Sequence, residues 1–214
     1  MKQILCYGDS NTWGHNPETG LRHDWNTRWP GVLARLLGEE YHVIEDGIGG
    51  RTTVFDDPYF PNRNGRKALP YALLAHASID ILIISLGSND LKFTNALGAS
   101  KGIASLLRMA RNTASSNSKV PPLAADAKIL VISPILLDEH IETKRPDTFP
   151  AGAYEESCRF FENYQLVCQQ YGAELLDAAA FAQPSEVDCV HMNEENHNRL
   201  AHAVYEKIKE MELG

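Results

Sequence analysis

The sequence has 214 residues, of which 43% are hydrophobic and 22% charged, and its formal net charge at pH 7 is −8. These proportions are typical of a soluble globular protein rather than a disordered, fibrous or membrane protein, and the negative charge argues against nucleic acid or an anionic membrane as a partner. We therefore expect one domain over residues 1–214, without a signal peptide or membrane segment, in the cytoplasm.

The first predicted element is a buried strand, because the apolar run at residues 4–7 ends abruptly at Gly8. Ser10 follows two residues later. If the sheet is parallel, this serine lies at the edge where the strands of such sheets build their sites. The sequence thus offers Ser10 as a candidate nucleophile, although an ordinary βα turn with a helix cap explains the same residues. Asp9 is expected to hold the turn; the alternative is a phosphoacceptor, but no lysine partner or acidic pair stands beside it.

A helix over 28–38 and a strand over 41–45 come next, and they lead into a glycine-rich loop at 46–53. Three glycines in four positions allow the backbone N–H groups of this loop to approach a ligand. The loop lacks both the GxxxxGK[ST] and the GxGxxG patterns, which argues against a phosphate or dinucleotide site. A tight turn without a further role is the other interpretation.

The run at 79–86 is almost entirely apolar, which indicates a central strand buried on both faces. It ends in Gly87-Ser88-Asn89-Asp90. The Asn89 side chain can cap a turn, and its amide is also a donor suited to an oxyanion.

Helices and strands alternate through the rest of the chain, which predicts a doubly wound, three-layer α/β/α domain with a parallel sheet. We expect a long pocket-lining or interface loop at 134–152. The remaining predicted elements are a short helix through Leu69, Leu73 and Leu74, helices over 98–114 and 154–171, strands over 128–133 and 173–176, and a closing helix after Asn193 as its N-cap.

Asp188 precedes His191 by three residues, just ahead of the closing helix. In a turn, this spacing allows the carboxylate to accept from Nδ1–H of the imidazole and leaves Nε2 free to take a proton from a serine. Together the strand-end motifs provide the parts of an acyl-transfer site. Ser10 is the nucleophile, His191 the base and Asp188 its orienter, and the oxyanion hole consists of the Ser10 and Gly50 N–H groups with the Asn89 side chain.

The order of these motifs resembles that of the SGNH (GDSL-type) hydrolases. The matching blocks are Gly8-Asp9-Ser10, Gly50, Gly87-Ser88-Asn89-Asp90 and Asp188-Cys189-Val190-His191. The resemblance implies a flavodoxin-like five-stranded sheet in the order 2-1-3-4-5. It is greatest for the bacterial arylesterase and acyltransferase branch, which implies hydrolysis of short-chain or aryl esters, acyl transfer to alcohols in some members, and a homo-oligomer. Gly50 stands where that branch often has Ala or Gly.

We therefore expect a serine esterase that acts on small esters without a metal or cofactor. Carbohydrate O-deacetylation, thioester hydrolysis or a lysophospholipase activity on the same residues are alternatives, and so is a non-catalytic binding protein on this fold. Asp9, Asn11, Trp13, Lys92 and Phe93 are candidate pocket residues, although core packing explains Trp13 and a solvated loop explains Lys92 and Phe93 equally well.

The other histidines are expected at the surface, since none has metal-ligand spacing, and the cysteines are expected to be free thiols. The histidines concerned are His15, His23, His197 and His202. Cys189, within the Asp188–His191 turn, is interpreted as a small packing residue rather than a nucleophile.

Overall fold

The computed structural model describes residues 1–116 and 119–213, so residues 117, 118 and 214 of the predicted domain lie outside it. Within the described residues, five strands form one parallel sheet in the order β2-β1-β3-β4-β5, which confirms the predicted fold class and strand order. The strands are β1 (Lys2–Gly8), β2 (Tyr41–Gly47), β3 (Ile79–Ser85), β4 (Leu123–Ser133) and β5 (Glu174–Asp177).

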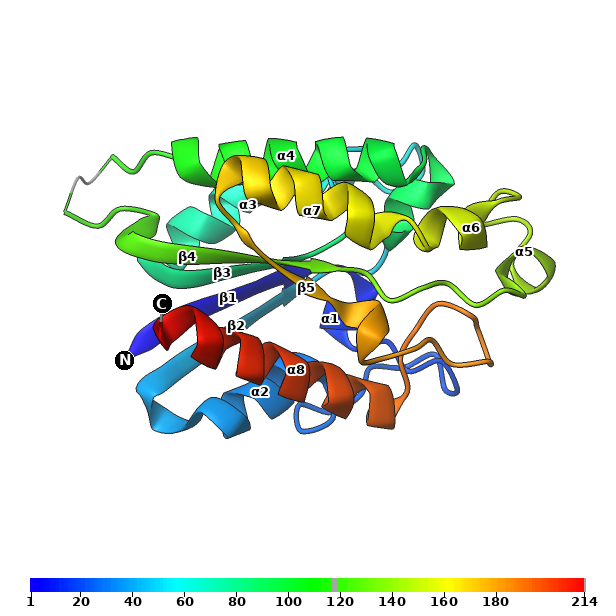
Figure 1. The fold of residues 1–214 in the computed structure, drawn as a ribbon, viewed down its shortest axis with the longest axis horizontal. Coiled ribbons are helices and arrows are strands. Elements are labelled where there is room, and N and C mark those ends of the chain that lie inside the picture. Colours follow the sequence, from blue (N-terminus) through cyan, green and yellow to red (C-terminus); the bar gives the residue numbers. More distant parts are fainter. Residues whose placement is uncertain (117–118, 214) are drawn as a thin grey trace.

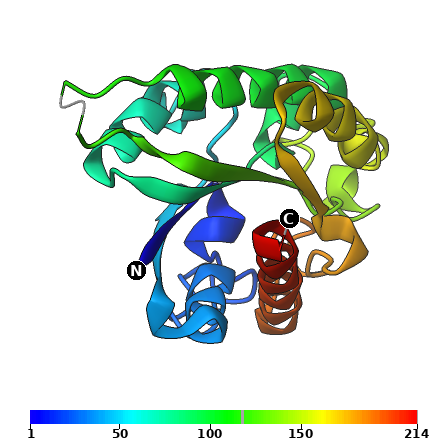
Figure 2. The same ribbon diagram turned by 60° about the vertical axis from the view of Figure 1, so that its left-hand side comes forward.

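The helices form two layers with the sheet between them (Figures 1 and 2). Three helices, α3, α4 and α7, cover one face, and α2 and α8 cover the other. None of the described helices is long and apolar enough to cross a membrane. The helices are α1 (Ser10–Trp13), α2 (Trp29–Leu37), α3 (Gly65–Ala75), α4 (Ala96–Asn112), α5 (Ile141–Lys144), α6 (Ala153–Ser157), α7 (Phe160–Tyr171) and α8 (Glu194–Leu213). Short 3₁₀ turns are η1 (Gly38–Glu40), η2 (Pro61–Arg63), η3 (Ser88–Lys92) and η4 (Ala178–Ala180).

Two hydrophobic cores, one on each side of the sheet, follow from the alternation of side chains along the strands. In β1, Leu5 and Tyr7 belong to the core under α3, α4 and α7, whereas Ile4 and Cys6 belong to the core under α2 and α8. All four are fully buried. A strand buried on both faces reads as a continuous apolar run, which is why β1 and β3 were recognisable in the sequence.

The predicted elements need three corrections. The helix expected over 154–171 is two helices, because the Ser157 hydroxyl bonds back to the Tyr154 carbonyl and accepts from Leu137 N, which anchors the end of α6. The strand expected at 128–133 begins at Leu123, which pairs with Ile79 across an irregularity in the register. The long loop at 134–152 contains the short helix α5.

The loops that follow β1, β2 and β3 meet at the carboxyl end of the sheet. Ile48 N donates to the Gly8 carbonyl at 3.2 Å, which joins the first two loops. The Asp90 carboxylate accepts from both the backbone N–H of Thr53 (2.9 Å) and the Thr53 hydroxyl, which joins the second and third. The motifs singled out in the sequence therefore lie in neighbouring loops.

Candidate active site

The nucleophile candidate Ser10 is the first residue of α1, directly after the Gly8-Asp9 turn. An oxygen of the Asp9 carboxylate accepts from Asn11 N at 2.9 Å and so caps the helix. Gly8 is required by close packing, since a Cβ at this position would lie 2.0 Å from Thr12 Oγ1. The chain after β1 is thereby held so that Ser10 is 8% exposed at the carboxyl end of the sheet.

Ser10, His191 and Asp188 form a continuous hydrogen-bonded series. His191 Nε2 is 2.8 Å from Ser10 Oγ, and His191 Nδ1 is 2.5 Å from Asp188 Oδ2. Because an ionised carboxylate only accepts, Nδ1 carries the proton and Nε2 is left as the acceptor for the serine hydroxyl. This is the arrangement in which a serine hydroxyl is activated as a nucleophile.

The Asp188 carboxylate is held in its ionised form by its own turn. Its second oxygen accepts from His191 N at 2.9 Å and from Val190 N at 3.0 Å. Burial alone would raise the pKa of Asp188, but the hydrogen bonds and charge of His191 and the bond from Val190 N outweigh burial and lower it to about 2. Asp188 is therefore a carboxylate at any pH at which the protein is expected to work.

Asn11 joins the turn that carries His191 to the loop that carries Ser10. Its Nδ2 donates to the Val190 carbonyl at 3.2 Å, and its Oδ1 accepts from Met192 N at 3.0 Å. The amide thus bonds to backbone groups on both sides of His191. We refer to Ser10, Asn11, Asp188 and His191 together as the cradle.

Asn89 and Gly50, the other proposed oxyanion donors, lie on adjacent loops. Asn89 Nδ2 is 3.2 Å from the Arg51 carbonyl and 3.5 Å from an Asp9 carboxylate oxygen, while Lys92 Nζ donates to Asn89 Oδ1 at 2.8 Å. This pattern turns the NH₂ end of Asn89 toward Asp9 and the glycine loop. Gly50 has a φ of +77°, and its N–H has no acceptor among the described residues.

Arg51 is a structural residue of the site that no sequence pattern singles out. Its guanidinium is buried and donates to the Gly8 carbonyl at 2.9 Å and to the Asp46 carbonyl at 2.6 Å, and it lies 4.0 Å from the Tyr7 ring centroid. It therefore ties the ends of β1 and β2 together beneath the glycine loop. A Gly-Arg-Thr sequence after a strand does not distinguish this inward arginine from a solvated one.

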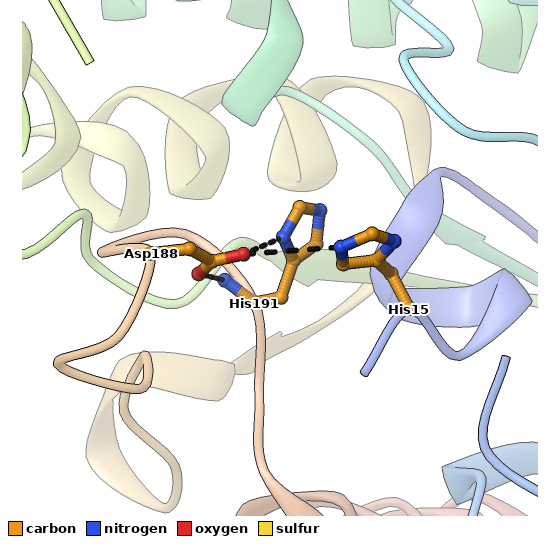
Figure 3. A group of neighbouring side chains, drawn as sticks. All are labelled: His15, Asp188 and His191. Carbon is orange, nitrogen blue, oxygen red and sulfur yellow. Dashed lines mark hydrogen bonds and ion pairs between the residues drawn. The ribbon is translucent and has the colours of Figure 1, made fainter. Parts of the chain in front are cut away.

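Two histidines lie in places that sequence reasoning missed. His15 was expected at the surface, but its ring lies 4.2 Å from that of His191 and its Nε2 lies 4.0 Å from Asp188 Oδ2 (Figure 3). His197 is wholly buried and accepts from Trp29 N at 3.4 Å, and burial lowers its pKa to about 3. The first expectation failed because the loop after Gly14 folds back toward the site, and the second because α8 packs this face against α2.

His15, Asp188 and His191 offer ligand atoms within 4.8 Å of one another, the spacing of a possible metal group. The 2.5 Å contact between Asp188 Oδ2 and His191 Nδ1 is too short for these two atoms to ligate one ion, since two zinc ligands at about 2 Å from the metal lie farther apart than that. The geometry is that of a hydrogen-bonded carboxylate and imidazole with a second ring against them.

The remaining pocket candidates lie around the cradle. Phe93 is 40% exposed and stacks on Phe55 with ring centroids 6.2 Å apart. Trp13 is half-buried, and the Arg22 guanidinium lies 5.1 Å from its ring.

Cys189 is buried in the His191 turn at a φ of +67°, and burial raises the pKa of its thiol to about 11, so the thiol stays protonated.

Comparisons with known proteins identify a family and several solved structures that the chain is similar to. The GDSL-like lipase/acylhydrolase family matches residues 6–199. A carbohydrate acetylesterase family member from Sinorhizobium meliloti is 34% identical with a TM-score of 0.89, and the alignment covers 99% of each chain. The aryl esterase of M. smegmatis is 32% identical with a TM-score of 0.90, covering 98% of this chain and 99% of that one. A search of the curated proteins found no match.

Proposed function

The chain belongs to the GDSL-like lipase/acylhydrolase family of SGNH hydrolases, and on that premise we propose that it hydrolyses short-chain or aryl esters through an acyl-serine at Ser10. It is an esterase or acylhydrolase by family. The observation that carries the finer proposal is the hydrogen-bonded series from Ser10 Oγ to His191 Nε2 and from His191 Nδ1 to Asp188. A base held in this way takes the serine proton as the nucleophile attacks the ester carbonyl.

In the proposed mechanism, Ser10 Oγ bonds to the carbonyl carbon while its proton moves to His191 Nε2. The negative charge on the carbonyl oxygen is stabilised by the Ser10 and Gly50 N–H groups and by Asn89 Nδ2. Collapse breaks the ester C–O bond, and the leaving alcohol takes the proton from His191. Water then attacks the acyl-serine by the same route, and an alcohol in place of water gives acyl transfer.

Carbohydrate O-deacetylation is a second candidate, supported by the similarity to the carbohydrate acetylesterases. It requires no change in the mechanism, because an acetyl group on a sugar hydroxyl is a short-chain ester. An acetylated sugar and p-nitrophenyl acetate share the acyl group and differ only in the alcohol. The ratio of kcat/KM on the two substrates therefore distinguishes the candidates.

The test is turnover of p-nitrophenyl acetate by the wild type and by Ser10→Ala and His191→Ala. We expect each variant to lose at least about 10³-fold in kcat while still folding, as a cooperative thermal unfolding transition would show. Ser105→Ala on α4 and the exposed His202→Ala on α8 are matched controls that should retain full activity. Equal rates for wild type and Ser10→Ala on both ester types would refute the proposal.

A further inference from the structure

Three cationic side chains lie at the proposed site, near Asn89, Gly50 and Asp188 in turn. The chain as a whole carries a net charge of −8. Lys92 Nζ donates to Asn89 Oδ1 at 2.8 Å. Arg63 packs on Gly50, where an added Cβ would lie 2.5 Å from its Nε. Arg145 reaches to 3.9 Å from Asp188 Oδ2. We refer to Lys92, Arg63 and Arg145 as the cationic rim.

Within the rim, the two arginines already have carboxylate partners. Arg63 pairs with Asp57 at 2.8 Å, and Arg145 lies near Asp188, whose oxygens are also taken by its own turn. Neither arginine therefore needs a ligand to balance its charge.

Lys92 differs from the arginines in its surroundings. It is half-buried, with Nζ 5.2 Å from the centroid of the Phe149 ring, and no carboxylate oxygen of the described residues lies within 4.0 Å of Nζ. A partly buried cation without a carboxylate partner is less stable than one in water, which shifts its titration toward the neutral form. Burial first, and the charges of Arg63 and Arg145 after it, lower the pKa of Lys92 to about 8, against the opposing effect of Asp9 and Asp57.

We propose that the substrate is an ester that carries a carboxylate near its scissile carbonyl, and that Lys92 binds this carboxylate as the specificity-determining residue. The proposal rests on the proposed esterase function and names its substrate class. Nζ of Lys92 is one hydrogen bond away from the amide assigned to the oxyanion, so a carboxylate on a short acyl or alcohol group reaches it. The ion pair would supply Lys92 with the carboxylate partner that it lacks among the described residues.

The experiment compares kcat/KM on matched anionic and neutral esters. The first pair, monomethyl and dimethyl glutarate, places the carboxylate on the acyl side, and the second, 4-acetoxybenzoate and its methyl ester, places it on the alcohol side. We expect the wild type to prefer the anionic member of at least one pair. That pair shows whether the carboxylate belongs to the acyl group or to the alcohol of the substrate.

Lys92→Gln should lower the preference for the anionic ester at least about tenfold, since a charge-assisted hydrogen bond is lost. Glutamine still offers an N–H to Asn89 Oδ1, so kcat/KM on the neutral ester should fall much less. Lys92→Arg should retain the preference, and Lys101→Gln on the exposed face of α4 is the matched control that should change nothing.

The pH dependence is a second readout that a purely structural lysine would not give. In the free wild-type enzyme the preference should be full below pH 7 and should decline as the pH rises through about 8, because Lys92 loses its charge while the substrate carboxylate stays ionised. Lys92→Gln should show no such decline.

Two results would overturn the proposal while leaving the esterase function intact. One is Ser10-dependent hydrolysis of the neutral esters without any preference for the anionic ones. The other is an equal loss on both members of a pair in Lys92→Gln, which would make Lys92 only a support for Asn89. If the wild type hydrolysed none of the four esters and did not hydrolyse p-nitrophenyl acetate either, the esterase function would be refuted as well.

Discussion

The cradle and the cationic rim meet at the same reaction centre but are held in different ways. In the cradle, His191 and Asp188 have side chains only 10% and 15% exposed, and backbone groups bond to Asp188 and to the amide of Asn11. In the rim, the side chains of Arg63 and Arg145 are 26% and 37% exposed, and their partners are other side chains.

This difference separates two tasks. A base must stay within hydrogen-bond reach of its nucleophile, and interlocked backbone bonds provide that precision. A rim that selects substrates needs only charge and shape at the entrance, so its residues can change without disturbing the chemistry. Substitutions in the cradle should therefore reduce stability and kcat together, whereas those in the rim should change substrate preference.

The largest effect on stability is expected from Asn11→Ala, which separates the two halves of the cradle. The Val190 carbonyl and Met192 N would both lose their partner in a buried site, where each unsatisfied group costs about 1–3 kcal/mol, so we expect a loss of about 3 kcal/mol in the free energy of unfolding. Urea denaturation measures this loss, and kcat should fall with it. The exposed Asn112→Ala on α4 is the control, and equal stability of the two variants would show that the cradle is not interlocked as described.

The second effect is a loss in the free energy of unfolding at low pH. Because the pKa of Asp188 is lowered to about 2 from an ordinary 3.8, its ionised form contributes stability that is present above pH 4 and is lost as the pH falls from about 4 toward 2. The contribution is about 2 kcal/mol at most. Asp188→Asn should flatten the decline in unfolding free energy between pH 4 and pH 2. A variant that declines as steeply as the wild type would place the acid sensitivity elsewhere, for instance at buried His197.

The smallest effect is expected at the border between the two regions, from His15→Gln. His15 contacts the His191 ring and has a side chain 29% exposed, and electrostatic contacts of this kind contribute less than about 1 kcal/mol. We expect kcat to fall less than about fivefold, with KM and thermal stability unchanged. His42→Gln, at an exposed position on β2, is the control. A loss of a hundredfold would instead indicate that His15 takes part in proton transfer.

The features that could be predicted from the sequence are those of regular or local structure. The strands were recognisable because burial on both faces demands apolar runs, and the polar residues directly after β1 and β3 had to lie close together once the sheet was parallel. The hydrogen bond between Asp188 and His191 could be predicted because the two residues are three positions apart in one turn. Each of these inferences depends on regular or local structure.

Features that depend on irregular loops could not be predicted in this way. Gly14, at a φ of +87°, turns the chain so that His15 lies against His191, but a glycine in a polar loop does not indicate the direction of the turn. Arg63 and Arg145 come from segments without periodicity, so nothing in their spacing relates them to Lys92. The rim is visible only when the loops are folded.

The distribution of thiols makes the native protein convenient for site-specific labelling. Cys6, Cys168 and Cys189 are buried, whereas Cys158 is exposed at the junction of α6 and α7. Through Glu156, which accepts from Ala96 N at 2.9 Å, this junction is tied to the start of α4, just beyond Lys92 and Phe93. A fluorophore attached to the unaltered chain would therefore go to Cys158, on a segment hydrogen-bonded to the start of α4, and would leave the three buried thiols unlabelled.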